Sequence, residues 1–78
     1  MTTKERWTLA LRGGLVAKVV DTWTMRDMPC DLRLVRSKKT KGLTCVVADV
    51  ASDEYEAIQW LYDVVRVTSC KVSRQPLK

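Results

Sequence analysis

The residues best suited to catalysis or metal binding are few in this chain and lie far apart. The three cysteines, Cys30, Cys45 and Cys70, form no CxxC pair, and their odd number leaves no complete disulfide framework. The sequence has no histidine, which is the usual general base at neutral pH and a common zinc ligand. We therefore interpret the cysteines as buried or half-buried thiols, and we expect neither an enzyme nor a metal or cofactor site.

Positive charge is the second chemical feature of the sequence. The formal net charge is +5, and basic residues gather near the middle of the chain and at its end. Such a surplus favours polyanionic partners. The middle cluster is a candidate contact with nucleic-acid phosphates and consists of Arg36, Lys38, Lys39 and Lys41. A solvated polar turn is the alternative interpretation of the same residues.

The glycine pair Gly13-Gly14 decides which elements position these side chains. It is compatible with a two-residue hairpin turn and with the start of a helix. At 100° per residue, the apolar residues that follow fall within an arc of about 140°, whereas a strand would divide them between both faces. The spacing therefore predicts a helix over residues 14–27, ended by Pro29. The apolar face of this helix consists of Leu15, Val16, Val19, Val20 and Trp23.

Strand patterns occupy the segments on either side of this helix. Residues 5–12 alternate between apolar and polar side chains, which is the period-two pattern of a half-buried strand. Residues 31–36 alternate in the same way, and residues 43–50 are rich in the β-branched side chains of a more buried strand. The polar sequence "SKKTKG" between them predicts a turn, so these two strands should form a hairpin.

A second helix and a last strand complete the pattern. Ser52 or Asp53 is the expected N-cap, Asp53 and Glu56 are spaced as a capping box, and residues 54–65 are amphipathic. Residues 66–74 are expected to form a strand that Gln75-Pro76 ends. The order βαββαβ predicts one α+β domain over residues 1–78, a ferredoxin-like sandwich whose four-stranded antiparallel sheet carries two helices on one face. We expect residues 1–4 and 75–78 to be flexible ends.

Several activities known on this fold are disfavoured by the residues present. An RNA recognition motif would place aromatic side chains on the strand "KGLTCVVA", where this sequence has Leu43, Cys45 and Ala48. A metal carrier would need a CxxC in the first loop, and an acylphosphatase-type site would need an asparagine, which the sequence lacks. Nucleic-acid binding through the basic hairpin stays open, and so does inhibition of a partner enzyme by surface contact alone.

The segment "GGLVAKVVDTWTMRDMPCDLRLV" resembles the first half of ACT domains, which are small amino-acid-sensing regulatory modules. The family pattern is a strand, a glycine, the sequence Leu-(Leu/Val)-Ala-(Lys/Arg)-Val in a helix, and a short turn into an edge strand. The ending "LYDVVRVTSCKV" is similar to that of the small regulatory subunit of acetohydroxyacid synthase, and the resemblance covers about residues 6–74. Arg12 and Gly13 stand where the family usually has an Asp or Asn and a Pro.

The resemblance implies a non-catalytic domain that forms a homodimer and modulates the catalytic subunit of an enzyme such as acetohydroxyacid synthase. An amino-acid effector would sit against the first loop and the start of the following helix, where free amides and the helix dipole receive a carboxylate. Glycines that merely allow a tight turn are the alternative. The expected ligand-binding residues are Gly13, Gly14, Leu15, Val16, Met28 and Cys30.

The tryptophans indicate which residues are buried, and the first residues of the chain indicate where the protein is located. Trp7 and Trp23 should be core residues. Trp60 lies toward the edge of the polar face of its helix, which predicts either an exposed contact surface or partial burial of its ring. No apolar run approaches the roughly 18 residues of a membrane span. Residues 1–6 lack the apolar stretch of a secretory signal. We expect a cytoplasmic protein that makes no membrane contact.

Overall fold

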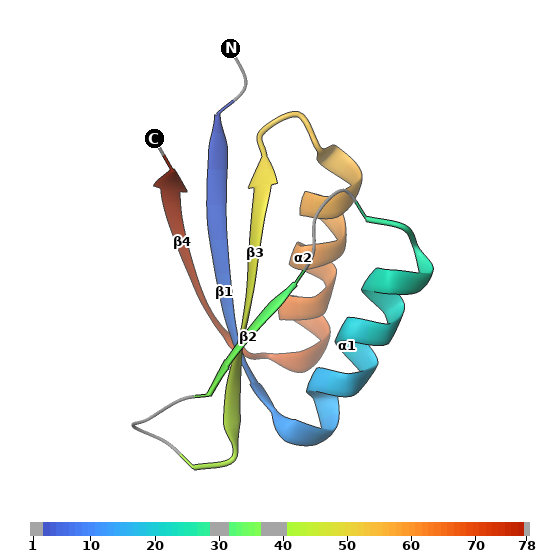
Figure 1. Ribbon diagram of the computed structural model, residues 1–78, viewed down its shortest axis with the longest axis vertical. Coiled ribbons are helices and arrows are strands. Elements are labelled where there is room, and N and C mark those ends of the chain that lie inside the picture. The colour runs from blue at the N-terminus through green and yellow to red at the C-terminus, as the bar shows by residue number, and fades with distance from the viewer. Residues whose placement is uncertain (1–2, 29–31, 37–40, 78) are drawn as a thin grey trace.

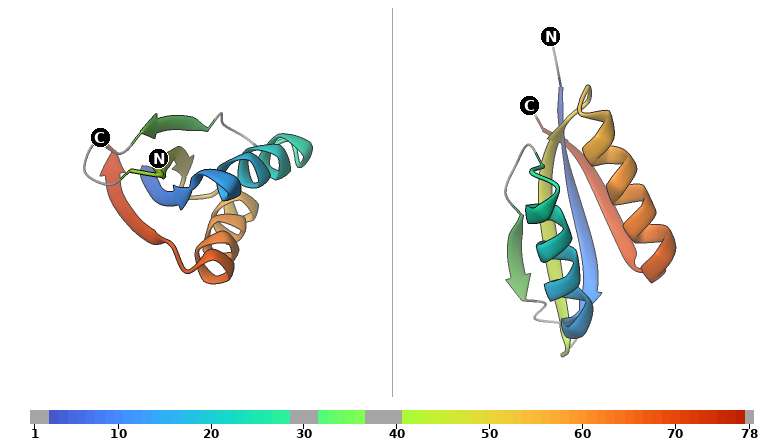
Figure 2. Two further views of the ribbon diagram at one scale, coloured as in Figure 1. Left: turned by 90° about the horizontal axis from the view of Figure 1, so that it is seen from below. Right: turned by 90° about the vertical axis from the view of Figure 1, so that its right-hand side faces the viewer.

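The computed structural model describes residues 3–28, 32–36 and 41–77. Its elements follow the order βαββαβ, and the strands form one antiparallel sheet in the order β2-β3-β1-β4 (Figure 1). Both helices pack on one face of this sheet (Figure 2). The ferredoxin-like α+β fold predicted from the sequence is therefore confirmed. The elements are β1 (Lys4–Arg12), α1 (Gly13–Met25), β2 (Arg33–Arg36), β3 (Leu43–Ala51), α2 (Tyr55–Thr68) and β4 (Lys71–Leu77).

The hydrophobic core lies between the sheet and the helices, because alternate residues of the two central strands are apolar on that side. These strand residues are at most 1% exposed, and each helix adds an apolar stripe to them. Trp7 and Trp23 are both in this core, as predicted. The core residues from β1 and β3 are Trp7, Leu9, Leu11, Val46, Ala48 and Val50, and those from the helices are Val16, Val19, Trp23, Ala57, Trp60 and Leu61.

The glycine pair starts a helix and not a hairpin turn. α1 begins at Gly13, directly after β1, and its buried residues Val16, Val19 and Trp23 repeat at helical spacing. Burial of this coherent face outweighs the weak helix propensity of valine, which amounts to tenths of a kcal/mol per residue. The helix ends at Met25, two residues earlier than predicted, and Asp27 follows in the left-handed region with φ of 51°.

The predicted capping box at the start of α2 is wrong. The N-cap is Glu54, and neither Ser52 nor Asp53 caps the helix, because no side chain bonds to its first amides. Glu54 instead closes a tight turn at the end of β3: its Oε1 accepts from the Ala51 amide at 2.8 Å, and its own amide donates to the Ala51 carbonyl at 3.1 Å. This turn uses the residues expected to begin the helix, so α2 starts later.

The boundary between α2 and β4 also differs from the prediction. α2 continues through Thr68, so residues 66–68 are helical, and Ser69 ends the helix in the left-handed region with φ of 53°. Gln75 and Pro76 lie inside β4, where Pro76 pairs with Glu5 of β1. An edge strand tolerates proline because one side of it needs no ladder partner. Lys4 and residues 75–77, expected as flexible ends, therefore belong to paired strands.

Candidate functional site: a cationic pocket at the start of α1

A pocket of about 500 Å³ lies where β1 passes into α1. Its apolar walls come from four different parts of the chain, which the fold brings to one end of the sheet. Two exposed cations, Arg12 and Lys71, stand at its edge. The other lining residues are Ala10, Leu11, Leu15, Leu43, Thr68, Ser69 and Cys70.

The first turn of α1 leaves two backbone amides beside this pocket. The Gly13 amide donates to the Gly42 carbonyl at 3.3 Å, and the Val16 amide is the first that the helix itself can bond. Among the described residues, the amides of Gly14 and Leu15 have no hydrogen-bond acceptor, and the side chain of the N-cap residue Arg12 does not cap the helix. These amides and the positive end of the helix dipole favour an anion at this position.

The two glycines are not needed for the turn itself. Neither Gly13 nor Gly14 has a positive φ, and a Cβ atom added at either would meet no atom within 4 Å. Gly42 differs, because its φ of 85° lies in the left-handed region that favours glycine. The glycine pair at the start of α1 therefore leaves open space beside the backbone without serving a steric need of the fold.

The structure brings together only part of the predicted ligand-binding set. Gly13, Gly14 and Leu15 lie at the start of α1. The side chain of Val16 points into the core, where it is 9% exposed, so it offers no surface to a ligand. Met28 lies beyond the opposite end of α1, beside a separate pocket of about 370 Å³. Cys30 lies outside the described residues.

The remaining pocket residues were missed because they are distant in the sequence. Lys71 reaches the site through pairing with Ala10, and Leu43 through pairing with Arg12. No local motif marks either residue as a site residue. Cys45 and Cys70 are half-buried free thiols, as expected, and Cys70 lines the pocket.

The predicted basic hairpin is described only at its two ends. Arg36 is exposed at the end of β2, and Lys41 is exposed next to Gly42. Lys41 lines a pocket of about 370 Å³ with Arg12 and Leu43, which places it close to the start of α1. Lys38 and Lys39 lie outside the described residues.

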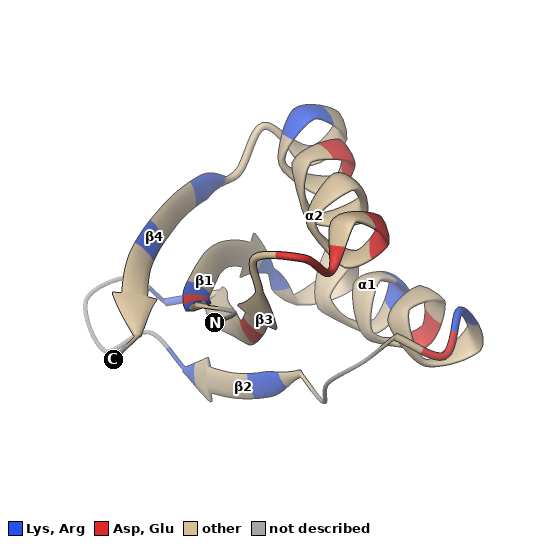
Figure 3. Cartoon of the chain, turned by 90° about the horizontal axis from the view of Figure 1, so that it is seen from above, with Lys and Arg blue, Asp and Glu red and all other residues tan. Residues whose placement is uncertain are grey.

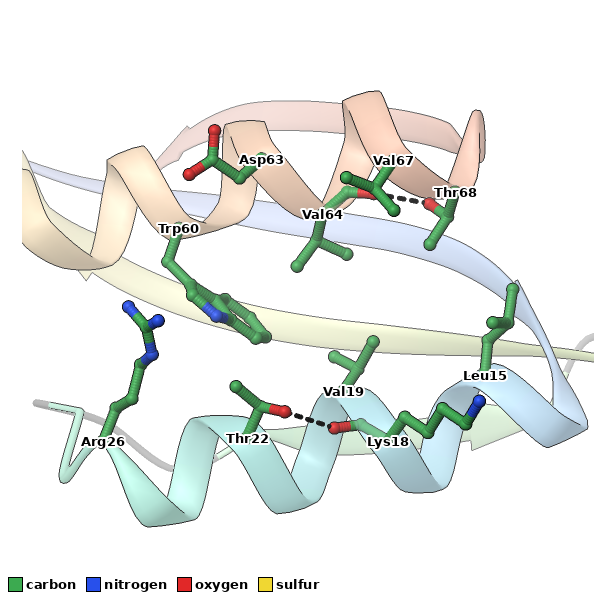
Figure 4. Close-up of a pocket in the computed structure, with 10 residues that line it drawn as sticks. All are labelled: Leu15, Lys18, Val19, Thr22, Arg26, Trp60, Asp63, Val64, Val67 and Thr68. Carbon is green, nitrogen blue, oxygen red and sulfur yellow. Dashed lines mark hydrogen bonds between the residues drawn. The ribbon is translucent and has the colours of Figure 1, made fainter.

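A second concavity, of about 350 Å³, runs between α1 and α2 (Figure 4). Val19, Trp60 and Val64 line its interior, while Lys18 and Asp63 stand on opposite helices. Trp60 is only 7% exposed, so the exposed contact surface is wrong and the alternative, burial of the ring, agrees with the structure. α2 is rotated so that Trp60 faces α1, where its ring packs edge-to-face on Trp23 with centroids 5.1 Å apart.

Arg74 ties the edge strand β4 to the helix layer. Its guanidinium lies 4.3 Å from the centre of the Trp7 ring, forms an ion pair with Glu5 at 2.8 Å, and donates a hydrogen bond to the Tyr62 hydroxyl. The hydrogen bond to Glu5 raises the pKa of Arg74 above its ordinary value. We assign this cluster a structural role, because all its polar contacts are internal.

Within residues 3–28, 32–36 and 41–77, no group of three or more Cys, Asp or Glu side chains is placed to hold a metal ion. In the same residues, neither helix is long and apolar enough to cross a membrane.

Comparisons of the chain with protein-family models, with curated proteins and with solved structures give no match.

Proposed function

We propose that this protein is a non-catalytic, ACT-like regulatory domain that binds a small apolar carboxylate, such as an amino acid, at the start of α1. The observation that carries the proposal is the pocket of about 500 Å³ that Arg12, Leu15 and Lys71 line. Within the described residues, the amides of Leu15 and of the preceding Gly14 have no hydrogen-bond acceptor. A volume of this size lies within the usual range of small-molecule sites.

The lining residues define which end of an effector is recognised. A carboxylate would accept hydrogen bonds from the Gly14 and Leu15 amides and pair with Arg12, while an apolar side chain would contact Leu15 and Leu43. No acidic residue lines the described pocket, so no carboxylate there would pair with an ammonium group. Recognition therefore depends on the carboxylate and the apolar body, and the ammonium group of an amino acid contributes little.

Calorimetric titration with three compounds that share the same isobutyl group tests this assignment. Leucine carries both charged groups, isocaproate lacks the ammonium group, and isoamylamine lacks the carboxylate. We expect leucine and isocaproate to bind and isoamylamine not to bind. Arg12→Gln should weaken isocaproate binding about tenfold, as expected for the loss of one charge-assisted hydrogen bond. Arg26→Gln, at the far end of α1, is the matched control and should leave binding unchanged.

Two results would overturn the assignment. Binding of isoamylamine as tight as that of isocaproate would show that the carboxylate is not recognised. An equal loss of affinity in Arg12→Gln and Arg26→Gln would show a response to net charge and not to a site.

The proposed domain forms a homodimer through the edge strand β2. Leu34 and Val35 are each 54% exposed on this edge, whereas the other edge strand, β4, carries Lys71, Arg74 and Pro76, which discourage pairing. A twofold axis perpendicular to the sheet would pair Leu34 with its own copy and Arg33 with Val35 of the second copy. This register extends the sheet without placing two arginines opposite each other.

Sedimentation equilibrium tests the dimer, and an activity assay tests the partner. We expect a dimer at tens of micromolar and a monomer for Leu34→Lys, which the exposed position of Leu34 should tolerate. A wild-type monomer at that concentration would contradict this interface.

Adding the protein to the catalytic subunit of acetohydroxyacid synthase from the same source should change the activity of that subunit. No change in activity at saturating protein would exclude this partner.

A further inference from the structure

Charge is divided between the two layers of the fold. Within the described part of the chain, the strands carry seven basic side chains and two acidic ones. The helices and the turns next to them carry six acidic side chains and three basic ones (Figure 3). The described strands therefore carry a formal net charge of +5, whereas the helices and the turns next to them carry −3.

Most of this positive charge lies on the face of the sheet opposite the helices, which we call the open face. Trp7 and Leu9 point into the core, so their neighbours Arg6 and Thr8 point the other way. Ion pairs of Arg6 and Arg33 with Asp49 show that β1, β2 and β3 share this face. The charged residues that we place there, among those described, are Lys4, Arg6, Arg12, Arg33 and Lys71, with the single carboxylate of Asp49.

Asp49 orders the centre of this charge without neutralising it. The Arg6 Nε lies 2.9 Å from its Oδ1, and the Arg33 Nη2 lies 3.2 Å from its Oδ2. The hydrogen bond from Arg6 lowers the pKa of Asp49, so the carboxylate stays ionised and holds both guanidinium groups. Lys4, Arg12 and Lys71 form no ion pair within the described residues.

Small side chains lie between these cations. Thr8, Ala10 and Ser73 occupy neighbouring positions on β1 and β4, and Cys45 and Val47 continue the same face on β3. Val35 is the one strongly exposed large apolar side chain on the described part of this face. Such a surface lacks the apolar and aromatic groups that insert into a lipid bilayer.

We propose that the open face binds single-stranded nucleic acid through its phosphate backbone, as an activity beyond effector binding that shares Arg12 and Lys71 with the effector pocket. Unpaired bases can lie over the small central side chains while the phosphates reach the surrounding cations. A duplex keeps its bases inside and would present phosphates alone. Because contacts to phosphates carry no sequence information, and the described open face has no aromatic side chain that stacks on bases, binding should depend weakly on base sequence.

The dimensions of the face set the expected strength of the salt dependence. Lys4 and Ala10 are separated by about 20 Å along β1, and β1 and β2 by about 10 Å across the sheet. This area accommodates about four phosphates. Each phosphate neutralised on a single strand contributes about 0.7 to the slope of log affinity against log salt concentration, so we expect a slope of about −3.

Fluorescence anisotropy with a labelled oligothymidylate of about a dozen nucleotides tests the proposal between about 50 and 200 mM salt. The double variant Lys4→Glu/Arg33→Gln changes two open-face side chains that lie outside the effector pocket, and it leaves Arg12 and Lys71 intact. Its matched control, Lys18→Glu/Arg26→Gln, makes the same charge change on the helix layer. We expect the first variant to lose at least about tenfold in affinity and the control to stay within about twofold.

A second variant works in the opposite direction and does not require that the first one folds. Asp49→Asn removes the acidic side chain of the open face and should tighten oligothymidylate binding severalfold. Equal losses in the two double variants, or no tightening in Asp49→Asn, would overturn the site. Tighter binding of a duplex or of anionic phospholipid vesicles would overturn the choice of partner. Isocaproate binding should be unchanged in Lys4→Glu/Arg33→Gln, so failure of either proposal leaves the other testable.

Discussion

Replacing Gly14 by alanine should stabilise the fold and weaken effector binding at the same time. The added Cβ would meet no atom within 4 Å, and Gly14 has no positive φ, so the new side chain introduces no strain. Alanine favours a helix over glycine by about 0.5–1 kcal/mol in a helix interior, and the first turn should realise about 0.5 kcal/mol of this. For a domain of this size, such a gain raises the Tm by about 2–4 °C.

The same methyl group would occupy the space through which a carboxylate approaches the Gly14 amide. Loss of one charge-assisted hydrogen bond should weaken isocaproate binding about tenfold. Gly13→Ala is the control, because the Gly13 amide already donates to the Gly42 carbonyl. Urea unfolding followed by tryptophan fluorescence measures the first effect, and calorimetry measures the second. A less stable Gly14→Ala protein would refute the steric reasoning, and unchanged affinity would refute the backbone approach.

Three further perturbations test particular contacts. Arg74→Ala should lower the free energy of unfolding by about 1–2 kcal/mol, because it removes the stacking on Trp7 and the ion pair with Glu5 together. A double-mutant cycle with Glu5→Gln separates the two contributions. A loss below about 0.3 kcal/mol would contradict a stabilising role of the cluster. Ser69→Gly should stabilise the protein by up to about 1 kcal/mol in thermal unfolding, because Ser69 has φ of 53°; destabilisation would be inconsistent with this conformation. Because the pKa of Asp49 is lowered in the folded state, the ionised Asp49 carboxylate stabilises the fold at pH values above its ordinary pKa of 3.8. This contribution to the free energy of unfolding is lost as pH falls through the folded-state pKa. Urea midpoints measured across this range should fall less steeply for Asp49→Asn than for the wild type, and parallel curves would exclude the linkage.

The sequence predicts the elements with strong periodicity. The valines of α1 and the alternating residues of β1 each support one regular structure, and burial on folding agrees with both patterns. The end of α2 was predicted wrongly, because Val65 and Val67 are β-branched residues, which are typical of strands. The left-handed Ser69 and the pairing of Lys71 with Ala10, which are tertiary features, fix the boundary.

The candidate sites were predictable only in part, for a related reason. Glycines before an amphipathic helix mark the start of α1 as a candidate anion site. The positions of Lys71 and Leu43 beside it depend on strand pairing between distant segments. The basic open face could not be predicted from the linear sequence either. Its cations are spread over three strands, and only the register of the sheet shows that they lie on one face.

The central claim is that a carboxylate binds at the start of α1, and an NMR titration tests it most directly. Uniformly ¹⁵N-labelled protein would be titrated with isocaproate while the backbone amide shifts are followed. We predict the largest shifts at the amides of Gly14 and Leu15, with smaller ones at Lys71. Absence of shifts at millimolar isocaproate, or maximal shifts at Val19 and Val64 in the groove between the helices, would contradict the claim.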